Sequence, residues 1–239
     1  MTVTRDQTGL ASEVVSRLGG RYSTELGIDV DADDGEVERW FLAATLFGAR
    51  ISAAVAEHSF RTLTVAGAGT IDQLRDVPAD EVVALLDAGG FAHYDVRMTR
   101  RLRALAAHIN LCYDGEVSAL GRRNRTYAAL RSALLDLPGW GPATGDLFLR
   151  ELRGVWAGAQ PPIDRRALLA GRHLGLIGPG DDDAAALAAI TDAADEEILD
   201  PRDLECALVR LTLAHCRLQA RCPGGRGCLV LRKADEQRS

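Results

Sequence analysis

Two features between residues 137 and 164 combine residue types and spacing that could do chemistry. The first is a Gly-X-Gly unit, Gly139-Trp140-Gly141, placed between apolar runs with helical spacing. Because glycine has no Cβ, such a turn lets backbone N–H groups approach an anion, and the start of the next helix adds unpaired donors and a favourable dipole. The second is Asp164, which stands directly before another helical run and could cap a helix or act as a catalytic carboxylate. Together they indicate a turn whose backbone binds phosphate without contacting bases, followed along the chain by a candidate catalytic acid.

Cysteines form a second group of candidate functional residues. Three of the five, Cys216, Cys222 and Cys228, crowd near the C-terminus, and Cys206 precedes them. In a chain whose N-terminus lacks the basic and apolar build of a signal peptide, such cysteines indicate a metal site or free thiols more than disulfides. Cys112 stands alone and is predicted to be a small core residue.

Helices must position these residues, because no alternation of apolar and polar residues persists long enough to predict a strand. Gly19-Gly20 ends a first helical run, Thr70 and Pro78 each begin another, and Gly89-Gly90 ends the run that follows Pro78. The main helices are predicted at residues 10–18, 38–63, 95–109, 126–135, 144–152, 183–194 and 203–216. The sequence therefore predicts an all-α fold.

The composition limits the class of protein. With 239 residues and 47% hydrophobic content, the chain can bury a substantial core as one large or two small domains. No apolar run approaches the roughly 18 residues of a transmembrane helix, so we expect no membrane contact and a cytoplasmic location. The formal net charge of −6 is unfavourable for a nucleic-acid-binding protein. Arginines nevertheless gather at residues 97–103, 122–125, 165–172 and 217–232, where they could bind phosphate or simply form solvated helix faces.

Residues 137–145, LPGWGPATG, resemble the helix-hairpin-helix motif of the endonuclease III-like DNA glycosylase superfamily. That motif usually reads LPGVG, two variable residues and Thr-Ala. Residues 162–168, PIDRRAL, and residues 172–176, RHLGL, resemble the catalytic segment of the family, a turn containing Val-Asp that enters a helix ending Arg-X-Leu-Gly. The motifs occur in the order of the family and at about its separation. The resemblance spans about residues 38–230 and is tightest at residues 115–176.

The resemblance implies a two-lobed, all-α glycosylase fold with an active-site cleft between the lobes. One lobe would be a central helical domain, residues 38–153, which ends in the helix-hairpin-helix. The other would combine residues 1–37 with residues 154–239, and would carry Asp164 and the cysteine-rich C-terminal loop.

The resemblance also implies roles for particular residues. Asp164 would be catalytic, because a carboxylate beside the sugar cation stabilises its charge and can deprotonate the attacking water. Phe47, His93 and Tyr94 would line the pocket for a base flipped out of the duplex. The residues expected to bind DNA are Gly139, Trp140, Gly141, Pro142, Thr144, Arg50 and Arg165. Simpler roles stay open for several of these residues: a core plug for Trp140, a helix N-cap for Asp164, a solvated surface position for Arg50, and packing for His93 and Tyr94.

The reaction type depends on a lysine. Bifunctional members of the family carry one in the second hairpin helix, where it attacks the sugar and then cuts the strand, and its position here is Ala143. Lys233 is the only lysine of the chain, and arginine does not serve as an amine nucleophile. We therefore expect a monofunctional DNA N-glycosylase of base excision repair, acting as a monomer on double-stranded DNA at the nucleoid. An AP lyase of the endonuclease III type and a catalytically inactive DNA-binding protein are the alternatives.

Many members of the family hold a [4Fe–4S] cluster with four cysteines spaced C-x6-C-x2-C-x5-C near the C-terminus. Here Cys222 and Cys228 match the last pair, but Thr212 and Gln219 stand at the other expected positions. Cys216 and Cys206, or His215, could supply the remaining ligands if the loop is rebuilt. A cluster and a metal-free loop therefore both stay open.

Overall fold

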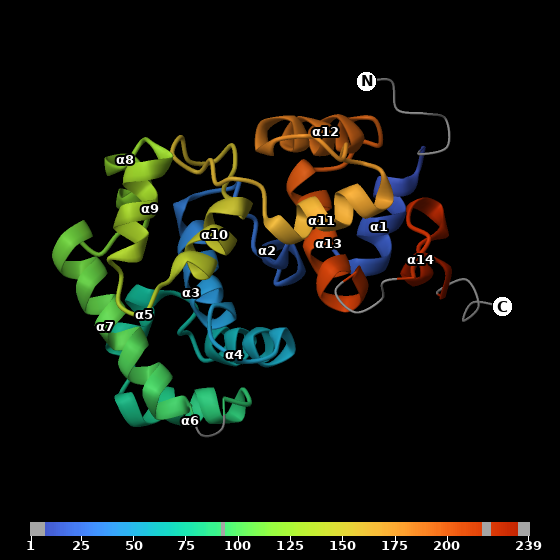
Figure 1. Ribbon diagram of the computed structural model, residues 1–239. Coiled ribbons are helices and arrows are strands. Elements are labelled where there is room, and N and C mark those ends of the chain that lie inside the picture. The colour runs from blue at the N-terminus through green and yellow to red at the C-terminus, as the bar shows by residue number, and fades with distance from the viewer. Residues whose placement is uncertain (1–7, 92–93, 217–220, 234–239) are drawn as a thin grey trace. The chain divides into compact units, whose positions relative to one another are not determined.

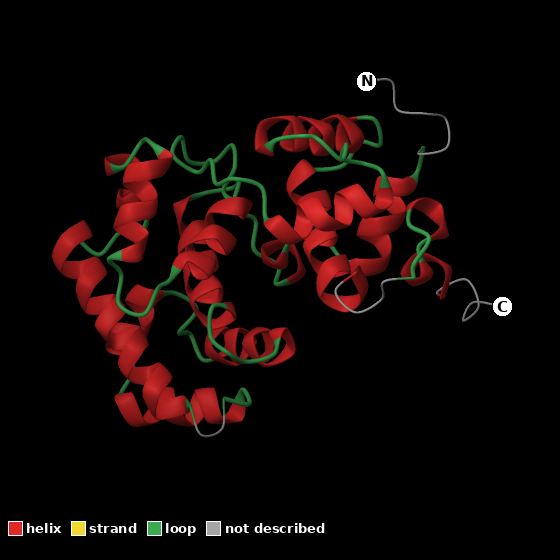
Figure 2. Cartoon of the chain, viewed as in Figure 1, coloured by secondary structure: helices red, strands yellow, loops and turns green. Residues whose placement is uncertain are grey.

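The computed structural model describes residues 8–91, 94–216 and 221–233, and every regular element in these ranges is a helix (Figures 1 and 2). The chain forms two compact units. One unit is Leu26–Pro161, and the other combines Met1–Glu25 with Pro162–Ser239. Among the described residues, no helix is both long enough and apolar enough to cross a bilayer.

The unit Leu26–Pro161 is organised around a buried helix. Its helices are α3 (Asp34–Phe47), α4 (Ala53–Val65), α5 (Ile71–Asp76), α6 (Ala79–Ala88), α7 (Asp95–Tyr113), α8 (Ser118–Arg123), α9 (Tyr127–Leu135) and α10 (Pro142–Glu151). The run from Trp40 to Leu46 is buried on all sides, because α4 and α10 pack against α3. A helical segment that is buried all round belongs in a core, and this second half of α3 supports the hairpin that leads into α10.

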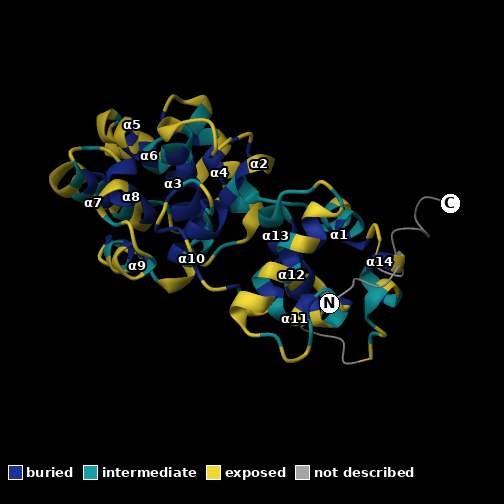
Figure 3. Ribbon diagram, turned by 90° about the horizontal axis from the view of Figure 1, so that it is seen from above, coloured by how far each residue is buried: buried dark blue, intermediate teal, exposed yellow. Residues whose placement is uncertain are grey.

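The unit that contains both termini is built around α13. Its helices are α1 (Leu10–Leu18), α2 (Tyr22–Glu25), α11 (Arg165–Leu174), α12 (Asp183–Asp195), α13 (Pro201–Leu211), the π-helix η2 (Thr212–Cys216), the 3-10 helix η3 (Gly225–Gly227) and α14 (Leu229–Lys233). α13 packs against α1, α11 and α12 (Figure 1). Buried apolar residues of these helices form one core, which Cys228 and Leu231 extend to the C-terminal segment (Figure 3).

Short polar contacts set the ends of several helices. The side chain of Thr70 accepts from the N–H of Gln73, whose side chain accepts from the N–H of Thr70, and this capping box begins α5 as predicted. α1 lacks a side-chain cap of its own. The carboxylate of Glu197 takes that role, because it accepts from the N–H groups of Gly9 and Ser12 at 2.8 and 2.7 Å.

The predicted helices differ from the observed ones mainly at their ends. The stretch 38–63 is two helices, and the first begins at Asp34 because the side chain of Asp33 accepts from the N–H of Glu36. The helix predicted at 95–109 continues to Tyr113, and Asp114 ends it with a φ of 56°. Cys112 lies in this added turn and is exposed, so its prediction as a core residue was wrong. The helix predicted at 203–216 begins earlier, at Pro201, and changes to a π-helix after Leu211.

Candidate functional site

A tight glycine turn builds the hairpin between α9 and α10. The N–H of Trp140 donates to the carbonyl of Leu137 across 3.1 Å, and Gly139 has a φ of 78°. Glycine adopts a positive φ at this position of the turn without steric cost. Pro142 follows as the first residue of α10, where the missing N–H leaves no intrahelical bond unmade. The residues between the two helices thus suit the turn that the structure shows.

The start of α10 offers open backbone donors. Gly141 is the N-cap residue, with a φ of −130°, and no side chain caps the helix. A Cβ added at Gly141 would meet no atom within 4 Å. Neither backbone strain nor packing therefore requires glycine at this position. Close approach of a ligand to the first-turn N–H groups is a physical reason for it, and the helix dipole makes that ligand an anion.

Trp140 and Thr144, both predicted to bind DNA, have buried side chains. The indole of Trp140 is 6% exposed, stacks on Phe41 with ring centroids 4.6 Å apart, and meets the ring of Phe148 edge-on. Its Nε1 donates to Oγ1 of Thr45 across 3.2 Å. The side chain of Thr144 is 3% exposed. Because both residues are almost fully buried, their side chains are not available to a ligand.

A pocket of about 550 Å³ opens beside the hairpin. Three segments line it: the loop after α3, the first turns of α7 with the residues before them, and the hairpin. The lining residues are Gly48, Ala49, Arg50, Ile51, Phe91, Tyr94, Arg97, Met98, Arg101 and Gly139. Three of them are arginines and none is acidic, so the pocket carries concentrated positive charge. Its volume is within the range of small-ligand sites.

Arg101 brings a partly buried charge to this pocket. Its Nε and Nη2 atoms are buried and have no hydrogen-bond partner among the described residues. Burial, and then the neighbouring charge of Arg97, lower the pKa of Arg101. A Cβ on Gly139 would collide with Nε of Arg101, so the glycine also lets the guanidinium lie against the turn. A buried cation without a partner is unfavourable, and an anion in the pocket would relieve that cost.

Asp164 lies in the other unit, at the start of α11. Its Oδ1 accepts from the N–H of Arg166 across 2.7 Å, which is an N-cap contact. Its own N–H donates to Oε1 of Glu205, a buried residue of α13, across 3.3 Å. The side chain of Asp164 is 24% exposed, and Nη1 of Arg166 lies 3.9 Å from Oδ2. The carboxylate is thus held in a fixed orientation at a helix N-terminus and remains accessible to water.

The described fold is similar to that of endonuclease III in a non-covalent complex with DNA. The TM-score is 0.51 at 17% sequence identity, and the match covers 99% of this chain and 100% of that chain. The chain has the endonuclease III fold. The predicted all-α fold class is therefore confirmed.

Two other solved structures resemble the chain more distantly. One is a trapped covalent intermediate of endonuclease III and DNA with an estranged adenine (TM-score 0.46, 18% identity, 98% and 100% of the two chains). The other is the H. pylori 3-methyladenine DNA glycosylase MagIII bound to 1,N6-ethenoadenine (TM-score 0.47, 14% identity, 87% and 99%). No protein-family model matches the sequence, and no curated protein matches it.

The endonuclease III fold brings some of the predicted site residues together. Arg50 and Tyr94 line the pocket beside the hairpin. Phe47, at the end of α3, does not line it, and its ring lies 6.4 Å from that of Trp40. Arg165 is exposed as the first residue of α11, and His93 lies outside the described residues.

Sequence reasoning gave no individual role to Arg97 and Arg101. The available signal was the cluster of arginines at residues 97–103, which by itself also fits a solvated helix face. Periodicity shows which arginines share a side of α7. It does not show that the loop after α3 and the hairpin line the same pocket as Arg97 and Arg101.

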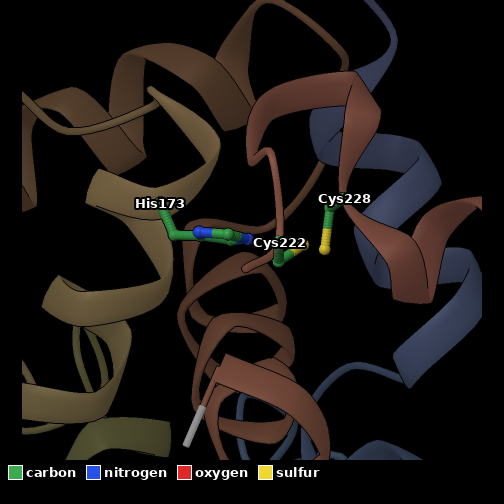
Figure 4. Close-up of side chains that lie close together, drawn as sticks. All are labelled: His173, Cys222 and Cys228. Atoms are coloured by element: carbon green, nitrogen blue, oxygen red, sulfur yellow. The ribbon is translucent and has the colours of Figure 1, made fainter. Parts of the chain in front are cut away.

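His173, Cys222 and Cys228 place three metal-ligating atoms within 4.8 Å of one another (Figure 4). This group could bind a metal ion. Burial by itself would raise the pKa of Cys222, but hydrogen bonds from the N–H groups of Leu229 and Gly224 and from the Cys228 thiol lower that pKa overall. Burial raises the pKa of Cys228. The two cysteines were predicted as ligands and His173 was not.

The described ligands do not fit a [4Fe–4S] cluster. Such a cluster needs four thiolates, each bound to a different iron at its own corner of the cube. The three described donors instead converge on one point, and one of them is an imidazole. Cys206, a predicted ligand, is fully buried on α13 and does not belong to the group. The side chain of Cys216, the other predicted ligand, lies outside the described part of the chain.

Proposed function

We propose that this protein is a DNA N-glycosylase of base excision repair, which hydrolyses the N-glycosidic bond of a damaged or mispaired base flipped out of duplex DNA. The observation that carries the proposal is the pocket beside the hairpin, where the described lining residues include three arginines and no acid. DNA is a polyanion, and an enzyme that works on a flipped nucleotide needs a pocket next to its grip on the strand. The similar solved structure is a complex of endonuclease III with DNA, which supports the same substrate class.

In this proposal both the hairpin and the pocket arginines bind the phosphates of the DNA strand. The N–H groups at the start of α10 would bind a phosphate at Gly141, and Arg50, Arg97 and Arg101 would neutralise the phosphates around the flipped nucleotide. These contacts fix the register of the protein without reading bases. Selection of the damaged base would then come from the lower cost of unstacking it and from its fit to the pocket. A monomer suffices for this arrangement.

Asp164 would assist the chemical step. The C1′–N bond breaks, its electron pair leaves with the base, and the sugar becomes an oxocarbenium-like cation. A water oxygen forms the new bond to C1′, and the carboxylate of Asp164 accepts a proton from that water. The negative charge of the carboxylate also stabilises the cation before water attacks. For this step the unit that carries Asp164 and the unit that carries the hairpin must act on the same nucleotide.

A lyase step is not part of the proposal. Ala143, the position at which the family resemblance places a nucleophilic lysine, is an exposed residue in the first turn of α10. A methyl side chain forms no Schiff base, and Lys233 is the only lysine of the sequence. The product is therefore an abasic site with an intact strand.

The test is base release from a panel of duplexes, each with one alkylated, deaminated, oxidised or mispaired base. We expect release from at least one duplex, with strand breakage only after alkali. Asp164→Asn is the informative variant, because asparagine caps a helix as well as aspartate does. Stability and DNA binding should survive, while release should fall about a hundred- to ten-thousand-fold, the usual contribution of a general base.

Three results would contradict the proposal in different ways. Strand cleavage without alkali would favour an AP lyase. If Asp164→Asn released the base as fast as the wild type, Asp164 would not be a catalytic residue. DNA binding with no release from any duplex would leave a DNA-binding protein without catalysis. Asp164→Ala serves as the stability control, because it removes the cap along with the carboxylate and should cost about 1 kcal/mol of folding free energy.

A further inference from the structure

The group formed by His173, Cys222 and Cys228 joins two segments that are far apart in the sequence. His173 belongs to the last turn of α11, and the two cysteines flank the loop that contains η3. Their three ligand atoms all lie within 4.8 Å of one another. Figure 4 shows the His173 side chain extending from α11 towards Cys222, with Cys228 beyond it. The fold therefore brings three potential metal ligands together from two separate segments.

The loop between the cysteines is shaped to bring them to His173. Gly224 has a φ of 76°, and a Cβ there would collide with the carbonyl oxygen of His173. Only glycine therefore allows the loop to lie this close to α11. The N–H of Leu229 donates to Sγ of Cys222 across 3.2 Å. Cys228 is fully buried, whereas Cys222 and His173 are partly exposed, so an ion has a path to the site.

The donor types and their spacing identify the class of ion. Two thiolates and one imidazole suit Zn²⁺ and are poor ligands for Mg²⁺ or Ca²⁺. Ligands that share one tetrahedral zinc, with bonds of about 2.3 Å to sulfur and 2.0 Å to nitrogen, lie about 3.5 to 3.8 Å apart. The observed upper limit of 4.8 Å requires only a small contraction to reach that spacing.

We propose that His173, Cys222 and Cys228 bind a single Zn²⁺ ion, which fastens the C-terminal segment to the end of α11. The site would be structural. It would hold η3 and α14 against the core that α1, α11 and α13 form. The fourth position of the tetrahedron is left to a ligand other than these three, such as water. The proposal stands independently of the proposed glycosylase activity.

The first measurement is the metal content of the full-length protein, purified without a metal-affinity step and without chelator. We expect one zinc per chain and no acid-labile sulfide. Exchange with Co²⁺ should give the thiolate charge-transfer bands in the near ultraviolet and the strong visible bands of a tetrahedral site. Chelator treatment should lower the melting temperature, and added Zn²⁺ should restore it.

The ligands are tested one at a time against a cysteine control. His173→Ala and Cys222→Ser should each lose most of the bound zinc, and Co²⁺ bound to Cys222→Ser should show weaker charge-transfer bands. Cys206→Ala is the matched control, because Cys206 was a candidate cluster ligand and lies outside this group; it should keep its zinc. Since Cys222 and His173 are partly exposed, these variants should still fold, and far-ultraviolet circular dichroism checks that they do.

Several outcomes would overturn the proposal. Iron with acid-labile sulfide in anaerobically purified protein would show a cluster. Zinc that persists in both ligand variants, or that is lost in Cys206→Ala, would place the metal elsewhere. Protein without metal that carries a disulfide between Cys222 and Cys228 would show that the two thiols approach each other for oxidation and do not bind an ion.

Discussion

Gly141 gives the sharpest test of the hairpin, because the folded chain has no steric need for glycine there. Its φ of −130° is accessible to any residue, and an added Cβ would meet no atom within 4 Å. Gly141→Ser should therefore fold normally. Serine is also a better N-cap than glycine, so α10 should gain a few tenths of a kcal/mol. A DNA phosphate bound to the first-turn N–H groups would, however, meet the new side chain.

The expected loss follows from the hydrogen bonds at stake. A hydrogen bond to a charged group contributes about 1.5 to 3 kcal/mol. Losing one of them weakens binding about ten- to hundredfold, since 1.4 kcal/mol corresponds to a factor of ten. Fluorescence anisotropy with a labelled duplex that contains an abasic-site analogue measures this loss. The salt concentration must be the same throughout, because phosphate contacts weaken steeply with salt.

Gly180→Ser is the matched control. Gly180 is exposed, and a Cβ there would also meet no atom within 4 Å, but it lies in the loop before α12, far along the chain from the hairpin. Its affinity for the duplex should equal that of the wild type. If Gly141→Ser keeps its melting temperature and binds the duplex as tightly as this control, then close approach of a phosphate does not explain the glycine. The hairpin would then lose its assigned role.

Other residues give independent tests. Arg101→Met should keep or raise the melting temperature, because it removes a partly buried charge without a partner among the described residues. The same variant should weaken duplex binding and lower the slope of log affinity against log salt by about one, and an unchanged slope would exclude a phosphate contact. Glu197→Gln should destabilise the protein by about 1 kcal/mol at neutral pH, as a lost helix cap does. Burial raises the pKa of Glu197, but hydrogen bonds from Ser12, Gly9 and Ala11 lower it overall, below its ordinary 4.5. The difference in stability between the wild type and Glu197→Gln should therefore be complete above about pH 4.5 and vanish as acid protonates the carboxylate. A difference in stability that persists in acid would refute this. Ile198→Gly should stabilise the protein by about 1 kcal/mol in urea unfolding, because Ile198 is 96% exposed with a φ of 56° at the end of α12, whereas Ile198→Val should keep the strain and gain nothing.

Local chemistry explains why much of the fold could be predicted. The helix break at Gly19, the capping box at Thr70 and the turn at Gly139 each depend on residues within a few positions of one another. Helix ends were less predictable where the deciding residue lay outside the periodic run. Asp33 begins α3 before the apolar pattern starts, and Asp114 ends α7 after it stops.

The candidate sites were less predictable because they collect residues from distant segments. The predicted metal ligands were the cysteines near the C-terminus, with His215 of the same segment as an alternative. Spacing within that segment cannot include a histidine on an earlier helix. His173 occupies the variable position of the Arg-X-Leu-Gly motif, so the resemblance gave it no role. For Asp164, the structure shows the N-cap contact directly, and its catalytic role stays a prediction.

The acidic net charge of the chain and the proposed binding of DNA are compatible because the charges are distributed unevenly. Away from the pocket, many arginines have acidic neighbours: Arg75 and Arg122, for example, each lie 3.2 Å from an aspartate. Arg50, Arg97 and Arg101 form no ion pair with any described residue, although they line one pocket. Neutralised arginines contribute little field at a distance, whereas three unpaired ones in a pocket without acids create a local positive potential. A phosphate responds to that local potential, and a formal charge of −6 summed over the whole chain does not describe it.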